Sequence, residues 1–189
     1  MSQGAAPRRS ILVGILRIAR GRADGVFCFG SSKQEFLSSL APLIAFPLVG
    51  AVLGIFSDGP RSALTGLTMT LCALLTPAVV SYELARLWKR ADAWMRFATA
   101  FNWCEWILPV MACVAMVPLG LATNAGVNET AANLALVCGL GLYGLWVQWF
   151  LARKALVLSG WRAVALVLLV NLATGAVVLG PHLLANAVG

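Results

Sequence analysis

Five long apolar stretches constrain this chain more than any other feature. They cover residues 36–56, 62–82, 103–122, 131–152 and 161–184. Each has the ~20 mostly apolar residues that a helix needs to cross about 30 Å of hydrocarbon. Backbone groups in lipid have to be hydrogen-bonded within their own segment, so each stretch is predicted to be a helix. The sequence therefore predicts an all-α fold, an integral membrane bundle of five transmembrane helices.

The composition excludes a water-soluble domain. The 189 residues are 60% hydrophobic and 11% charged, whereas soluble domains are about 45–50% apolar and about 25% charged. So few charges cannot cover a water-facing surface, and a disordered chain is excluded for the same reason. In such a chain the net charge of +7 favours anionic lipid headgroups over nucleic acid as the partner.

Basic residues predict the orientation. On one side of the five spans lie thirteen of the fourteen Lys and Arg residues, and only Arg61 lies on the other. By the positive-inside rule the N-terminus is cytoplasmic and the C-terminus is outside. The seven tryptophans also map to the cytoplasmic side. Because eukaryotic sorting signals are absent from the sequence, we expect a multi-pass protein of a bacterial inner membrane.

The chain divides into a cytoplasmic segment, residues 1–35, and a membrane domain, residues 36–189. Ser32 and Glu35 form an S-x-x-E capping box that predicts the start of the first membrane helix. Within residues 10–20, helical spacing places Ile11, Ile15 and Ile18 opposite Arg17 and Arg20, so an amphipathic helix and a plain segment are both open.

A second amphipathic pattern covers residues 84–101. Its apolar residues recur at three- and four-residue steps, and its basic residues fall largely off that stripe. This pattern is typical of a helix lying along the cytoplasmic interface, with a plain loop as the alternative. We expect the basic residues here and at the end of the fourth span to contact lipid headgroups. They are Arg86, Lys89, Arg90, Arg96, Arg153 and Lys154.

Few polar residues lie within the apolar stretches, and the candidate intramembrane cluster is Asn102, Glu105, Gln148 and Asn171. Ionisable groups in a membrane are costly and are therefore functional candidates. For Glu105 we favour a structural role, solvated near the interface or paired with Arg153, Lys154 or Arg162, and the alternative is a transport site. Asn171 is predicted to hydrogen-bond a neighbouring helix.

Glycines indicate close helix contacts. Gly50 and Gly54 form a G-x-x-x-G pattern, for which we favour packing within the chain and keep a homodimer as the alternative. Gly139, Gly141 and Gly144 match the dinucleotide pattern G-x-G-x-x-G. That site needs a strand before it and a βαβ unit, and this match lies in an apolar span, so Gly141 and Gly144 are assigned to helix packing.

Catalytic and metal-binding patterns are missing from the sequence. It has a single histidine, no H-E-x-x-H, G-x-S-x-G or P-loop pattern, and an odd number of cysteines without C-x-x-C spacing. We therefore predict no catalytic residue, no cofactor and no metal site, and the chain is not expected to be an enzyme. The five cysteines are interpreted as buried thiols.

Two short segments carry a family resemblance. They are Ala100-Phe101-Asn102-Trp103-Cys104-Glu105-Trp106 and Trp149-Phe150-Leu151-Ala152-Arg153-Lys154. With five spans and a cytoplasmic N-terminus, the chain resembles YIP1-like (Yip1 domain) membrane proteins, in their uncharacterised bacterial branch. The resemblance covers residues 30–184 and implies the five-span fold.

Two function classes follow from these patterns. In the first, a non-enzymatic membrane protein binds a membrane-protein partner, or organises lipid, at its cytoplasmic face. The alternative is a small transporter or transporter subunit with a polar path near Glu105. Five spans are few for a transporter, although a homodimer could compensate.

Overall fold

The computed structural model describes residues 10–57 and 59–188, and these form helices without a strand. The elements are α1 (Ile11–Ala19), the 3₁₀ helix η1 (Ala23–Cys28), α2 (Lys33–Ser57), α3 (Pro60–Leu87), α4 (Ala91–Cys104), α5 (Ile107–Asn124), α6 (Glu129–Ala155) and α7 (Gly160–Val188). The predicted all-α class is confirmed.

Five helical segments are long and apolar enough to cross a membrane. They are Lys33–Ser57, Pro60–Leu87, Ala91–Asn124, Glu129–Ala155 and Gly160–Pro181. The third combines α4 and α5, which follow one another with a break of two residues. The chain is therefore a multi-pass membrane protein, and the predicted number of spans is confirmed.

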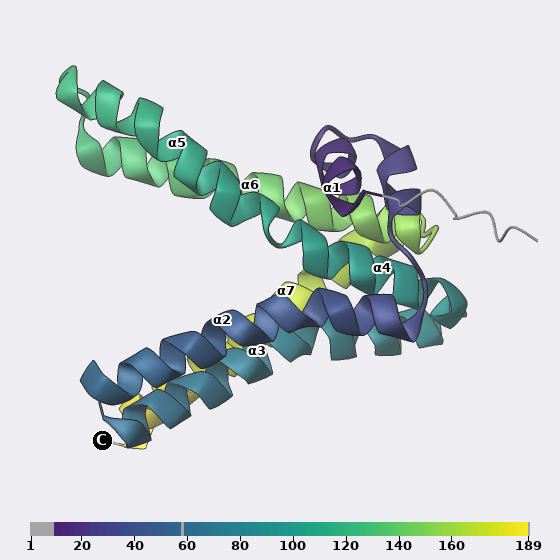
Figure 1. The fold of residues 1–189 in the computed structure, drawn as a ribbon, viewed down its shortest axis with the longest axis horizontal. Helices are drawn as coiled ribbons and strands as arrows, with labels where there is room; N and C mark the ends of the chain where they lie inside the picture. Colours follow the sequence, from purple (N-terminus) through teal and green to yellow (C-terminus); the bar gives the residue numbers. More distant parts are fainter. Residues whose placement is uncertain (1–9, 58, 189) are drawn as a thin grey trace, which may run out of the picture.

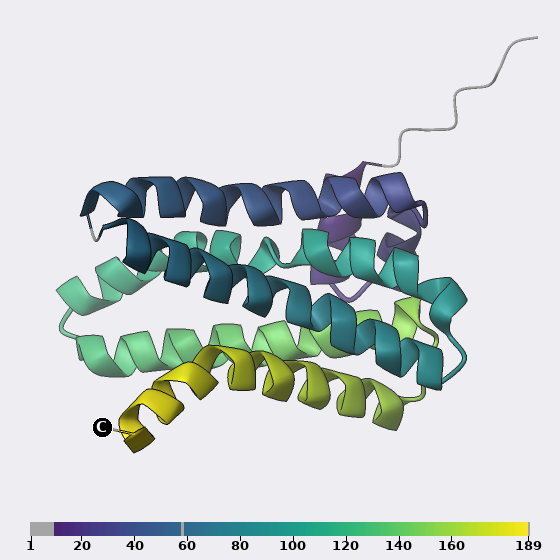
Figure 2. The same ribbon diagram turned by 90° about the horizontal axis from the view of Figure 1, so that it is seen from below.

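The long helices form two arms that diverge from a common end (Figure 1). We call α2, α3 and α7 the first arm and α5 with α6 the second arm. Where the arms meet, α1, η1 and α4 lie among the starts of α2 and α7 and the ends of α3 and α6. We call this region the basic end, after the charges described below. Figure 2, turned by 90°, shows the long helices running lengthwise from this end to the opposite one.

Side-chain burial is confined to the basic end. Its largest fully buried side chains include Ile18, Phe29, Phe97, Leu151 and Leu166. Beyond it, the outer part of each arm exposes most of its apolar side chains, such as Leu121, which is 67% exposed. This distribution fits a membrane protein, because lipid tails solvate apolar side chains as well as a protein core does.

The prediction of one continuous helix over residues 84–101 is wrong. Residues 84–87 complete α3, the chain turns at Trp88–Arg90 with Lys89 at a φ of 57°, and α4 then begins at Ala91. Half of the fourteen residues of α4 are buried. Its apolar stripe packs against helices α2, α3 and α6 rather than against lipid, and the two environments select the same apolar spacing.

Trp94 shows most clearly that α4 packs against other helices. Its ring is 9% exposed and lies against Phe36 and Tyr82, with ring centroids 5.4 and 5.0 Å away. The indole Nε1 donates a hydrogen bond to the Ser81 hydroxyl over 3.0 Å. Trp94 therefore anchors α4 to α2 and α3.

Two helix starts have side-chain caps. The predicted capping box at the start of α2 is confirmed: Ser32 Oγ accepts from the Glu35 backbone N–H at 3.2 Å, and Glu35 Oε2 accepts from the Ser32 backbone N–H at 3.1 Å. At the other end of the molecule, Asn128 caps α6 by accepting from the Ala131 backbone N–H at 3.0 Å. Both satisfy N–H groups that a helix start leaves without partners.

Candidate functional site

A polar cavity lies where the two arms meet. It has a volume of about 330 Å³ and is lined from α2, α3, α4, α6, α7 and the α4–α5 break. Its polar lining residues are Thr70, Asn102, Glu105, Gln148, Asn171 and Thr174. All four residues of the candidate intramembrane cluster therefore share one cavity, although they are up to 69 positions apart in the chain.

Asparagine 171 ties the two arms together inside this cavity. Its Nδ2 donates to Gln148 Oε1 on α6 over 2.7 Å and to the Val167 carbonyl on its own helix over 2.8 Å. The predicted interhelical hydrogen bond of Asn171 is confirmed. Both amide hydrogens of Asn171 are used in these bonds, so its amide oxygen is left as a hydrogen-bond acceptor.

Asparagine 102 makes a second interhelical contact. It is 6% exposed, and its Nδ2 donates to the buried Ser39 hydroxyl of α2 over 3.0 Å. The Ser39 hydroxyl in turn donates to the Phe36 carbonyl over 2.6 Å. This chain of hydrogen bonds holds α4 against α2 and fixes the amide of Asn102 at the cavity wall.

Glutamate 105 lies in the break between α4 and α5, half-buried. The ion pairs of the described residues are Arg17–Asp24, Arg22–Asp24 and Arg86–Glu83. The expected pairing of Glu105 with Arg153, Lys154 or Arg162 is therefore wrong. Arg153 follows the cavity residue Gln148 by more than one helical turn, about 7.5 Å along α6, and its guanidinium stacks on Trp149 instead.

Three polar contributors to this region lie outside the predicted cluster. Thr70 and Thr174 line the cavity, and Ser39 accepts a hydrogen bond from Asn102. Thr70 resembles its neighbours Thr65 and Thr68, because each hydroxyl bonds a carbonyl of its own helix. The sequence offered no signal that would separate the cavity-facing hydroxyl from the others.

The basic end gathers positive charge. Eleven of the twelve Lys and Arg residues that the structure describes lie at this end, on the elements that meet there or in the turns beside them, together with five carboxylates. The twelfth, Arg61, lies in the first turn of α3, at the opposite end of the molecule. The exposed members of the expected headgroup-contact set are Arg86, Lys89, Arg90, Arg153 and Lys154. The charges predicted to face one side of the membrane thus lie at one end of the molecule.

Arginine 96 differs from those five. Its side chain is half-buried, its guanidinium carbon lies 5.8 Å from the centre of the Phe27 ring, and its Nε has no hydrogen-bond partner among the described residues. Arg96 therefore packs α4 against η1, and it is less available to a headgroup than the exposed five.

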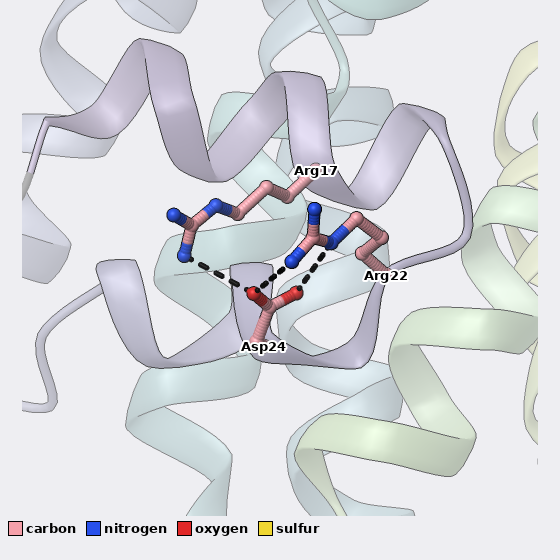
Figure 3. Close-up of polar contacts among 3 residues, drawn as sticks. All are labelled: Arg17, Arg22 and Asp24. Atoms are coloured by element: carbon pink, nitrogen blue, oxygen red, sulfur yellow. Dashed lines mark hydrogen bonds and ion pairs between the residues drawn. The ribbon is translucent and has the colours of Figure 1, made fainter.

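Ion pairs fix the shape of the N-terminal part of the basic end. Asp24 of η1 lies between Arg17 of α1 and Arg22, at 3.2 and 3.0 Å (Figure 3). Tyr143 of α6 donates its hydroxyl proton to the Ala19 carbonyl over 2.8 Å, which joins α1 to the second arm. Residues 10–20 therefore contain a short helix that docks on the bundle.

The four packing glycines differ in their surroundings. A Cβ at Gly144 would lie 2.9 Å from Leu108 Cδ1 of α5, and one at Gly54 would lie 3.6 Å from Ala63 Cβ. At Gly50 and Gly141 a Cβ would meet nothing within 4 Å among the described residues. Gly144 thus permits the close approach of α5 and α6.

Metal-ligating side chains do not gather anywhere in the described ranges, where no three His, Cys, Asp or Glu residues could hold one ion. All five cysteines are free thiols. Only Cys104 is buried, while Cys72, Cys113 and Cys138 are exposed. The interpretation as buried thiols is therefore wrong for those three, because these membrane helices are largely exposed outside the basic end.

The chain matches no protein-family model, no curated protein and no solved structure. The resemblance to YIP1-like proteins stays a prediction. The basic end and the polar cavity are the two features of the molecule that bear on its function.

Proposed function

We propose that this chain is a non-enzymatic membrane protein that organises anionic lipid, or binds a membrane partner, through its basic end. The carrying observation is the segregation of eleven described basic residues at one end. Anionic lipids attract such residues with about 1 kcal/mol per Lys or Arg near the surface. Orientation with this end in the cytoplasm, in a bacterial inner membrane, belongs to the same proposal.

Three exposed side chains at the α3–α4 turn are the best place to test it. Arg86, Lys89 and Arg90 lie within five consecutive residues and are exposed. Lys89 and Arg90 take part in no ion pair among the described residues, so their charges are available to headgroups. A matched control exists in Arg61, a basic residue at the opposite end.

The test measures lipid selectivity by electron paramagnetic resonance in proteoliposomes, with spin-labelled phosphatidylglycerol and phosphatidylcholine. We expect wild type to immobilise the anionic lipid preferentially and the triple variant R86Q/K89Q/R90Q to lose most of that preference. R61Q should keep it, and high salt should weaken it by screening. Equal immobilisation of the two lipids by wild type, or an unchanged triple variant, contradicts the lipid-organising form of the proposal.

A small transporter or transporter subunit is the second candidate, favoured by the polar cavity. Polar groups from both arms line about 330 Å³ within the spans, and Glu105 is their one carboxylate. Uptake of a panel of small polar solutes into proteoliposomes tests this function. We expect E105Q to abolish uptake and E83Q, at the basic end, to leave it unchanged. Absence of uptake across the panel contradicts the transporter.

We further propose kinship with the YIP1-like family. The support is the pair of short segments around Asn102 and Arg153 together with the five spans. Those segments contribute Asn102 and Glu105 to the cavity and Arg153 to the basic end.

A further inference from the structure

The free polar atoms of the cavity are mostly hydrogen-bond acceptors. Asn171 donates both amide hydrogens, to Gln148 and to the Val167 carbonyl, so its amide oxygen remains free to accept. Thr70 and Thr174 each donate to a carbonyl of their own helix and keep an acceptor oxygen. Glu105 adds a carboxylate, which when ionised only accepts.

Donors are few by comparison. The Nε2 of Gln148 and the second amide hydrogen of Asn102 have no partner among the described residues. No Lys or Arg lines the cavity. An anionic ligand would therefore meet a carboxylate and no compensating charge, whereas a ligand rich in N–H donors finds acceptors on several walls.

We propose that this cavity binds an organic cation with a protonated amine, whose ammonium group is held by the Glu105 carboxylate and the amide oxygens of Asn102 and Asn171. The volume of about 330 Å³ lies at the lower end of small-molecule pockets, which run from about 300 to 1,000 Å³. It is about ten times the roughly 30 Å³ that one water occupies. A molecule of several heavy atoms fits, and a bare metal ion would leave most of the space empty.

The shared chemistry is the primary ammonium, which a free amine or an ethanolamine lipid headgroup can supply. Both arms contribute lining residues to the cavity that would receive it. This inference goes beyond lipid binding at the basic end, and it names the ligand class of the second candidate function. Binding is measured apart from lipid selectivity and uptake, so its failure is distinguishable from theirs.

The test uses the full chain in phosphatidylcholine nanodiscs, because the choline headgroup has no N–H donor. Isothermal titration calorimetry compares benzylammonium with its neutral and anionic counterparts, benzyl alcohol and benzoate, which have the same ring. We expect saturable binding of benzylammonium and much weaker binding of the other two. A second series in phosphatidylethanolamine nanodiscs identifies the source: weaker binding there indicates that the lipid headgroup occupies the cavity, and unchanged binding indicates a free amine.

Two isosteric substitutions move the affinity in opposite directions. E105Q removes the charge and is expected to weaken benzylammonium binding at least about tenfold, the size of a charged hydrogen bond. Q148E adds a carboxylate, keeps an oxygen for Asn171, and is expected to tighten binding. E83Q is the matched control and should change nothing. Absence of saturable binding, tighter binding of benzoate, or an affinity unaffected by E105Q and Q148E overturns the proposal.

Discussion

The basic end and the outer arms of this molecule are built by different rules. At the basic end, side chains such as Phe97 at 2% exposure pack in a shared core, and hydrogen bonds such as Trp94–Ser81 and Asn102–Ser39 cross between helices. In the outer arms apolar side chains face outward, as Leu121 does at 67% exposure. The packed helix α4 is less apolar in sequence than the outward-facing helix α5, so hydrophobicity alone does not decide which region forms a core.

Packing partners account for the difference. In lipid there is no hydrophobic force between helices, so association depends on close packing and on polar contacts. The basic end has small buried residues, among them Ala85, Ala100, Ala152 and Ala163, at which helices approach closely. The polar cavity lies at the boundary, where the Asn171–Gln148 hydrogen bond joins the two arms before they diverge.

The largest expected effect separates the two regions directly. Phe97→Ala empties a buried site in α4 and is expected to lower the free energy of unfolding by about 2–3 kcal/mol. This is below the ~3–5 kcal/mol typical of soluble cores, because detergent or lipid solvates the Phe97 ring when unfolding exposes it. The measurement is unfolding in mixed micelles at increasing denaturing detergent.

The control for that variant is Leu121→Ala in α5, whose side chain faces outward. We expect less than about 1 kcal/mol of change there, because no cavity forms inside the protein. Comparable losses at Phe97 and Leu121 would contradict the division into a packed end and lipid-facing arms.

Gly144 and Gly141 allow a packed position and an open position to be compared within one helix, α6. Gly144→Leu would drive a side chain into Leu108 and is expected to destabilise α5–α6 packing by about 1–3 kcal/mol. Gly141→Leu meets open space and is expected to be neutral or slightly stabilising, because leucine favours a helix. The same detergent titration reads both variants. Equal effects would mean that Gly144 does not set the distance between α5 and α6.

The sequence predicts the fold and the cavity contacts only in part. Span length and polarity predict five helices, because crossing lipid requires them. Asn171 was identified as an interhelical partner because an isolated amide in a span needs one. Neither the docking of α4 nor the separation of Gly144 from Gly141 could be predicted, since both depend on which neighbour each helix face meets.

The smallest expected effect concerns the exposed ion pairs of Asp24. Asp24→Asn removes the pairs with Arg17 and Arg22, whose side chains are 40% and 63% exposed. Exposed pairs contribute about 0–1 kcal/mol and weaken with salt. We expect a loss of at most about 1 kcal/mol at low salt that largely disappears at 1 M salt, measured by thermal unfolding. A loss as large as that of Phe97→Ala would show that α1 and η1 anchor the core.

The separation of the arms in a bilayer is the central claim, and double electron–electron resonance in nanodiscs measures it most directly. In a variant without its five cysteines, one label pair at Leu53 and Leu121 spans the arm tips, and another at Leu37 and Asp92 spans the basic end; all four sites are exposed. The structure predicts a longer distance across the tips than across the basic end. Tips as close as the base, or closer, would show that the arms meet in lipid and would contradict the account.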